Sequence, residues 1–233
     1  MISDTAAQVP GSLDALTGYS KISAIALTDA GAPSLSITYS QYTDDSTVLG
    51  KLSGSYSLVV SAAPVSAAAA LQADSHVTTF AISDTAAHVL ADLDGLDGVT
   101  KVSTIAFTDA DAPSLSITYT QYTADATALS KIIGSYTLVV SAVPVSASAS
   151  LQADNHVTAF ALLDSSHNVV ASLGTLIEDS KLSSITLSDG QPLVISETQN
   201  EIFHKKLDTL APEAILLINN GGAPNLITLV DRT

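Results

Sequence analysis

Apolar and polar residues alternate in a pattern that returns along this chain at a fixed interval. The clearest instance is the phrase Lys-φ-Ser-x-Ile-x-φ-Thr/Ser-Asp, where φ is apolar, which is typical of one strand with a buried face. It stands at 21–29, 101–109 and 181–189. Most positions of 21–80 and 101–160 are identical, without a gap, so the internal repeat has to be considered before any local motif.

Within the first repeat the hydrophobic period switches three times between strand and helix. Strands are predicted at 22–28, 34–37, 56–61 and 77–83. A first helix is predicted from Thr38, its N-cap, with Tyr39, Tyr42, Leu49 and Leu52 on one face. A second is predicted over 64–72, and a third from its cap Asp84 to Gly95 or Gly98. Strands beginning at 22, 56, 77 and 102 would then be neighbours in one sheet.

The second repeat has the same order, with strands from 102, 136 and 157, whereas the third departs from it. There the strand 193–195 and the segment 198–207 follow a loop that is two residues shorter. Later strands are predicted at 214–218 and 226–230, with a Gly-Gly-Ala-Pro turn at 221–224. Divergence at this end indicates a cap, which stacked repeats need to close their core.

Strands joined by short crossover helices, with starts at 22, 56, 77 and 102, predict a parallel sheet with helices on the other face. Val77, Phe80 and Ile82 follow an apolar-x-x-apolar-x-apolar spacing that resembles leucine-rich repeats, although the ladder Asn of that family is missing. We therefore predict an α/β fold: a leucine-rich-repeat-like, right-handed β/α solenoid of roughly eight or nine turns, with three turns in each sequence repeat. The alternative is a flat α/β sandwich of separate domains.

The predicted domains are a repeat solenoid over 1–210 and C-terminal capping strands over 211–233. The repeat units are placed at about 2–81, 82–161 and 162–210. Because residue 2 already lies within a repeat, we expect the chain to be a piece of a longer protein.

Composition limits the classes of function that are expected for this chain. A net charge of −15 would repel DNA or RNA, so a nucleic-acid partner is not expected. The absence of cysteine excludes disulfides and thiol chemistry. The first residues show no basic start or apolar run, so no signal peptide is expected, and the lack of a long apolar stretch predicts no membrane insertion.

Phrases such as Asp-Thr-Ala-Ala-His-Val and Leu-Gln-Ala-Asp-Asn-His-Val resemble the repetitive Ala/Thr/Asp-rich segments of large exported, adhesin-like proteins of alphaproteobacteria. The resemblance covers the chain to about residue 210 and implies an extracellular or cell-surface location. It also implies adhesion or calcium binding, but the glycine-rich nonapeptide of calcium-binding toxin repeats is missing here.

Recurrent aspartates are the candidate metal ligands. They are Asp4 with Asp29, Asp84 with Asp109, and Asp164 with Asp189. Each pair would end neighbouring strands about 4.8 Å apart, where Ca²⁺ could bridge two carboxylates. The competing interpretation is that they cap helices and turns, which alone explains their place in the sequence. No other cofactor is expected.

Other side chains offer weaker sites. His76 and His156 each follow an aspartate by two residues and are interpreted as turn residues, and His88, His167 and His204 have no recurrent partner. Tyr39, Tyr42, Tyr119 and Tyr122 are either a packing face or an aromatic stripe for sugars. Outward Ser and Thr residues are a minor candidate for a hydroxyl-rich surface. They include Ser23, Thr28, Thr78, Thr79 and Thr104.

No nucleophile motif or phosphate loop stands out from the repeat, so no catalytic residue is assigned. The sequence predicts a non-catalytic repeat segment of a large exported bacterial protein, acting as a structural spacer or an adhesion surface. The alternative is a polysaccharide- or calcium-binding module attached to an extracellular enzyme. Expected partners are a surface glycan or another copy of the chain at exposed ends.

Overall fold

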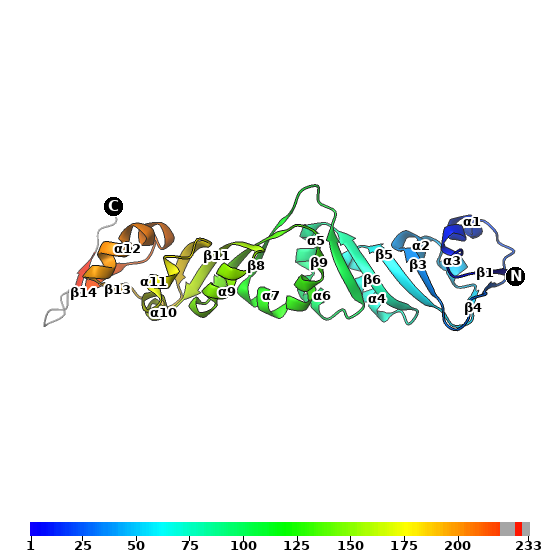
Figure 1. Ribbon diagram of the computed structural model, residues 1–233, viewed down its shortest axis with the longest axis horizontal. Coiled ribbons are helices and arrows are strands. Elements are labelled where there is room, and N and C mark those ends of the chain that lie inside the picture. The colour runs from blue at the N-terminus through cyan, green and yellow to red at the C-terminus, as the bar shows by residue number, and fades with distance from the viewer. Residues whose placement is uncertain (220–226, 230–233) are drawn as a thin grey trace. The chain divides into compact units, whose positions relative to one another are not determined.

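A computed structural model describes residues 1–219 and 227–229. They form two compact units, one made of 1–113 with 124–135 and the other of 114–123 with the residues from 136 onward. In both units short helices alternate along the chain with strands that pair in parallel, and among the described residues only β14 and β15 pair in the antiparallel sense (Figure 1). The predicted α/β class with parallel sheets is confirmed at this level.

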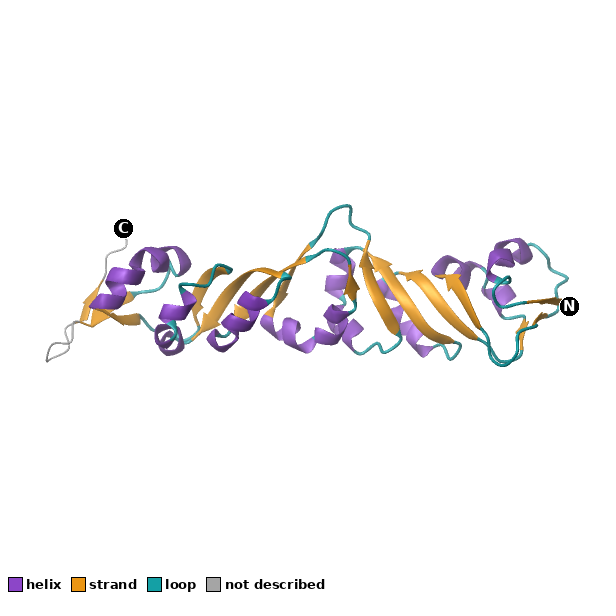
Figure 2. Ribbon diagram, viewed as in Figure 1, coloured by secondary structure: helices purple, strands orange, loops and turns teal. Residues whose placement is uncertain are grey.

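Figure 2 shows the strands in orange and the helices in purple. The strands are β1 Ile2–Asp4, β2 Ile25–Leu27, β3 Ser34–Thr38, β4 Leu52–Ser53, β5 Ser57–Ala63, β6 Val77–Asp84, β7 Val102–Phe107, β8 Ser114–Thr118, β9 Ile132–Ile133, β10 Thr137–Val143, β11 Val157–Asp164, β12 Leu182–Leu187, β13 Leu193–Ser196, β14 Leu216–Asn219 and β15 Ile227–Leu229.

The helices are short except for the last. They are η1 Pro10–Ser12, α1 Leu13–Thr17, α2 Tyr39–Asp44, α3 Ser46–Leu49, η2 Val65–Ala67, α4 Ala68–Ala73, α5 Ala86–Ala91, α6 Leu93–Asp97, α7 Tyr119–Ala124, α8 Ala126–Ser130, η3 Val145–Ala147, α9 Ser148–Ala153, α10 Ser166–Ala171, α11 Leu173–Leu176 and α12 Glu197–Leu210. Among the described residues, none of these helices has the length and apolar character needed to cross a membrane.

The longest strands pair with their neighbours in chain order. In the first unit the sheet order is β3-β5-β6-β7-β9, and β1-β2-β4 is a second sheet. In the second unit the order is β12-β11-β10-β8, and β13-β14-β15 is a separate sheet. The pairing of β5 with β6 and of β6 with β7 agrees with the sequence prediction.

The long first turn of each repeat differs from its prediction. The strand expected at 22–28 is reduced to β2, and β2 does not pair with β5. Instead β2 pairs with the two-residue strand β4, and β5 pairs with β3. In the second repeat β7 pairs with the two-residue strand β9, as β2 pairs with β4 in the first. A strand of two residues is too short to show any period, which is why the sequence pattern could not reveal β4 or β9.

The single helix predicted from Thr38 to Leu52 is also wrong. Thr38 is the N-cap, and a capping box with Gln41 starts α2 as its side chain suggests. The helix then breaks at Asp45 before α3 begins, and Leu52 lies in β4. Lys51, which lies within the range of the predicted helix, therefore follows α3.

A β-bulge explains the unusual spacing of apolar residues. In β6 the side chains of Val77, Phe80 and Ile82 are buried, with two residues between the first two. The pairing register with β5 shifts by one residue at this point. The extra residue of a bulge places Val77 and Phe80 on the same face although they are three positions apart. Phe80 has no exposed surface and belongs to the buried core.

Several outward hydroxyl groups donate hydrogen bonds to backbone carbonyl groups of the neighbouring strand. Thr78 Oγ1 donates to the Leu58 carbonyl at 3.2 Å, and Ser103 Oγ donates to the Phe80 carbonyl at 3.0 Å. These carbonyl groups lie where the strand register shifts, so the hydroxyls satisfy acceptors that the regular ladder misses. At these positions Ser and Thr stabilise the sheet.

The C-terminal part follows its predicted elements with adjusted bounds. Strand β13 covers 193–196, and β14 begins two residues later than predicted. Within the predicted strand at 226–230, β15 covers 227–229, and the two end residues lie outside the described part. The predicted turn at 221–224 lies outside the described residues.

Candidate functional site

Aspartates at the ends of strands accept hydrogen bonds from backbone N–H groups of the preceding turn. Asp84, the last residue of β6, accepts from Val65 N at 2.9 Å and from Thr85 N at 2.8 Å. Asp109, which follows β7, accepts from Ala86 N at 2.7 Å. The N–H groups at the start of a helix have no partner within it, so these carboxylates satisfy donors that would otherwise be unpaired.

The other predicted aspartates also accept hydrogen bonds from backbone N–H groups, although the donor to Asp4 is the next residue in the chain. Asp164 accepts from Val145 N at 2.8 Å, Asp29 from Ala6 N at 2.6 Å, Asp189 from Ser166 N at 3.0 Å, and Asp4 from Thr5 N at 2.8 Å. Within the described residues no cluster of three or more His, Asp or Glu side chains is arranged to hold a metal ion. A cation bridged by only two carboxylates stays a prediction.

The pKa values of the best-bonded strand-end aspartates reflect these donors. For Asp84, burial alone would raise the pKa of the carboxyl group, but hydrogen bonds from His88, Val65 and Thr85 hold it below its usual value. For Asp164, burial would likewise raise the pKa and is again outweighed by donors, chiefly Val145 N–H. Both groups are therefore carboxylates whose oxygens are already occupied by hydrogen-bond donors.

Asp84 does not have the capping role that the sequence suggested. The N-cap of α5 is Thr85, whose hydroxyl accepts from His88 N at 3.3 Å. Asp84 lies one residue earlier and uses one oxygen to reach the turn that precedes its own strand. The sequence shows only that an acid precedes a helix. Its oxygen accepts from the first residue of a different helix, 19 residues away, because β5 and β6 pair in parallel.

A second recurrent group surrounds Asp74, in the loop before β6. Tyr42 donates its hydroxyl to Asp74 Oδ2 at 2.8 Å, and His76 N donates to Oδ1 at 2.8 Å. The His76 ring stacks on Tyr56 with centroids 4.6 Å apart. Lys101 Nζ donates to the Asp74 carbonyl at 2.7 Å. We call these five residues the tyrosine–histidine cluster.

The second unit contains an equivalent cluster. It consists of Tyr122, Asp154, His156, Tyr136 and Lys181. The ring centroids of Tyr136 and His156 are 4.4 Å apart, and Tyr122 donates to Asp154 at 2.8 Å. The sequence presents the tyrosines and histidines as separate candidates, and Tyr56, Asp74 and Lys101 are not among them. Their common recurrence from the first repeat to the second was the signal that could have joined them.

Electrostatics fixes the protonation of this cluster. Burial, followed by the hydrogen bond to Asp74, raises the pKa of Tyr42 to about 12, so its hydroxyl stays a donor. Burial opposes ionisation of Asp74, but bonds from His76 and Tyr42 hold the pKa of this carboxyl below its usual value. The His76 side chain is 51% exposed. Each cluster thus presents an exposed histidine ring stacked on a half-buried tyrosine ring, an arrangement able to pack against an apolar sugar face.

One hollow contains the residue types of an acyl-transfer enzyme. It has a volume of about 610 Å³ and is lined by Ser66, Asp84 and His88 among others. His88 Nδ1 lies 2.7 Å from Asp84 Oδ1, although sequence analysis found no partner for His88. In the second unit Asn168 Nδ2 donates to Asp164 Oδ1 at 2.8 Å in the same way. The side-chain amide of Asn168 cannot act as a general base. The property that His88 and Asn168 share is therefore a hydrogen-bond donor beside an aspartate.

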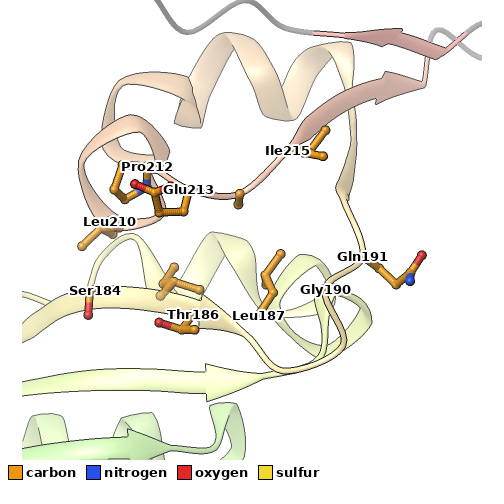
Figure 3. A pocket seen from close by; sticks show the side chains of 11 residues that line it. Ser184, Thr186, Leu187, Gly190, Gln191, Leu210, Pro212, Glu213 and Ile215 are labelled. Atoms are coloured by element: carbon orange, nitrogen blue, oxygen red, sulfur yellow. The ribbon is translucent and has the colours of Figure 1, made fainter.

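A further hollow lies between β12 and the residues that follow α12. Its volume is about 380 Å³, and Figure 3 shows Leu187 on one side with Pro212 and Ile215 on the other. The polar side chains in its lining are Ser184, Thr186, Gln191 and Glu213. No histidine or lysine of the described residues lines it. His204, for which the sequence showed no recurrent partner, has its Nδ1 2.8 Å from the Asn200 carbonyl oxygen within α12.

Comparison with known proteins found no family model, no curated protein and no solved structure that matches this chain.

Proposed function

We propose that this chain is a non-catalytic repeat segment of a large exported bacterial protein, in which a leucine-rich-repeat-like, right-handed β/α solenoid acts as a structural spacer or adhesion surface. Its location would be extracellular or at the cell surface. The predicted repeat units and the boundary near residue 210 belong to this proposal. So does the resemblance to adhesin-like segments of alphaproteobacteria.

The main support is that the distinctive contacts of one repeat return in the next. Asp84 with Val65 and Asp164 with Val145 form equivalent bonds of 2.9 and 2.8 Å. A unique active site would set one repeat apart, whereas a scaffold uses the same stabilising bond at every turn. The recurrent strand-end carboxylates of this chain are committed to backbone donors, which favours the role of a scaffold.

The tyrosine–histidine clusters favour a second candidate, a module that binds polysaccharide beside an enzyme domain. Each cluster is complete within one unit, so each could bind a sugar independently. Two equivalent sites on one chain would raise the apparent affinity for a polymer through multivalency. A calcium-binding module is the other form of this alternative, and it depends on the paired aspartates.

The test combines localisation with binding. An antibody against the chain is expected to label the surface of intact producing cells, and the purified chain is expected to bind a component of a glycan or cell-surface array. If a cluster is responsible, Tyr56→Ala combined with Tyr136→Ala should weaken binding at least tenfold. Tyr19→Ala, at an exposed tyrosine outside both clusters, is the matched control and should leave binding unchanged.

A chain found only in the cytosol and without an array ligand would contradict the proposal. Surface labelling without any array ligand would retain the spacer and reject the adhesive surface. Binding that both the double variant and the Tyr19 control retain would exclude the clusters as the sugar site.

A further inference from the structure

Two aspartates lie in the helical layer without the hydrogen bonds that a buried carboxylate requires. Asp45 and Asp125 are each 3% exposed, and both belong to the first unit. In each of them Oδ2 is buried without a hydrogen-bond partner among the described residues. Burial of an unpaired charge is costly, so the ionised form of either group is disfavoured in the fold.

Both residues stand where a helix breaks, and α12 provides an internal comparison. Asp45 separates α2 from α3, seven residues after the capping-box residue Thr38. Ser196 begins α12 with an equivalent capping box, and seven residues later Phe203 continues the helix. The break therefore accompanies the acid, which suggests that the buried carboxyl group is a built feature of the first two repeats.

The neighbours of Asp125 are acidic. Its side chain contacts the carboxyl group of Asp94, and Asp97 is the other charge that acts on it, both from α6. Asp97 Oδ1 accepts from Ala128 N at 3.1 Å, which satisfies one donor of α8. Lys131, which follows α8, donates to the Val99 carbonyl at 3.0 Å rather than to Asp125.

Asp45 has a corresponding setting. Asp14 and Thr17, from α1, contact its carboxyl group, and Asp44 is the remaining nearby charge. The Thr17 hydroxyl donates to Asp45 Oδ1, which leaves Oδ2 facing no donor among the described residues. Within that part of the chain neither Asp45 nor Asp14 forms an ion pair with a lysine, arginine or histidine. The two sites occupy equivalent positions in successive repeats and share this chemistry.

A proton on one carboxyl group of each pair would supply the missing donor. Two touching carboxylates repel each other, whereas one acid and one carboxylate form an O–H···O⁻ hydrogen bond. We propose that Asp125 with Asp94, and Asp45 with Asp14, each bind one shared proton in the folded chain. The helical layer of the first unit is then a pH-sensitive element that is most stable in mildly acidic solution.

The electrostatic environment agrees with this geometry. Burial, then Asp94 and then Asp97, raise the pKa of Asp125 from 3.8 to about 6. Burial also raises the pKa of Asp45. The hydrogen bond from Thr17 opposes this shift, and the neighbouring Asp14 adds to it. A carboxyl group with a raised folded-state pKa contributes stability that is fully present below the unfolded value. That contribution is lost as pH rises through about 6 for Asp125.

The test compares chemical unfolding of the full chain with that of Asp125→Asn at pH 4.5 and 7.5. An amide gives Asp94 a permanent donor. The variant should therefore raise the folding equilibrium constant by up to about a hundredfold at pH 7.5, as a shift of about two pKa units implies. At pH 4.5 the gain should fall to less than about tenfold, because the folded pair is already protonated there and only the unfolded carboxyl group is still ionised. Asp94→Asn should show the same pattern if Asp125→Asn does not fold.

Asp111→Asn is the control for net charge, since Asp111 is an exposed turn residue. It should change the equilibrium constant by less than about threefold at both pH values. Equal effects of Asp125→Asn and Asp111→Asn would overturn the proposal, as would carbon-13 spectra in which no aspartate titrates above pH 5. Stabilisation of the wild type, but not of Asp125→Asn, by millimolar Ca²⁺ at pH 7.5 would assign the pair to a cation and overturn it as well.

Discussion

The same side chain has opposite surroundings in two regions of this molecule: at the strand ends, as in Asp84, and between the short helices, as in Asp125. We call the first group strand-end aspartates and the second helix-layer aspartates. Asp84 accepts from two backbone N–H groups and lies within hydrogen-bond distance of His88, and its pKa is held below its usual value. Asp125 has an oxygen without a donor among the described residues and an acid beside it, and its pKa is raised to about 6, by burial first. Both are largely withdrawn from water, so the number of donors decides the outcome.

The difference shows how a strongly acidic repeat can fold. Carboxylates at strand ends stabilise the fold because each meets backbone donors that the adjoining turn leaves unpaired. Carboxyl groups in the helical layer are tolerated only when they bind a proton. The strand-end group contributes stability above its unfolded pKa and loses it as pH falls through the folded value. The helix-layer group behaves in the opposite way, so stability should be highest in mildly acidic solution.

Removal of a strand-end carboxylate should have the largest effect. Asp84→Ala leaves the N–H groups of Val65 and Thr85 without their acceptor and should reduce the free energy of unfolding by about 3 kcal/mol at pH 7. Asp164→Ala should cost a similar amount, through Val145 and Ser165. Urea unfolding followed by circular dichroism measures both, with Asp111→Ala as the exposed control. A loss no larger than that of the control would remove the contrast between the two kinds of aspartate.

Loss of a single donor to a well-bonded aspartate should have a smaller effect. Tyr42→Phe deletes one of the donors to Asp74 and should cost about 1 kcal/mol at pH 7, as should Tyr122→Phe in the second unit. The raised tyrosine pKa of about 12 means that stability from this hydroxyl is lost between pH 10 and 12. Ultraviolet titration should show two tyrosines that ionise only near pH 12 in the wild type and one in each variant, apart from Tyr56 and Tyr136, whose pKa values burial also raises. Tyrosines that all ionise together near pH 10 would contradict the buried hydroxyl bond.

Much of the fold could be predicted because its main strands carry a clear period. The strands containing Val60 and Phe80 were placed within two residues of their observed bounds. The strands β4 and β9 could not be predicted, since a two-residue strand is defined only by its partner. The helix break at Asp45 had a local signal, an acid inside an apolar face, but the apolar period across it looked continuous.

The candidate sites were predicted less completely than the fold. The recurrence of the aspartates makes them visible in the sequence, yet partners such as Val65 are brought near them by strand pairing, which no local pattern encodes. Tyr56 and His76 are well separated in the chain, and their ring contact depends on the pairing of β5 with β6. The shared proton of Asp125 could not be foreseen, because Asp94 has the sequence pattern of an ordinary surface residue until α6 and α8 are packed together.

The measurement that tests the central claim most directly is a thermal melt of the chain at pH 7.5, in millimolar Ca²⁺ and in chelator. The central claim is that strand-end carboxylates are satisfied by backbone donors and hold the repeats together without a metal. We predict the same melting temperature in both samples. A rise of many degrees with Ca²⁺ would contradict this claim and would favour a calcium-binding module built on pairs such as Asp84 with Asp109.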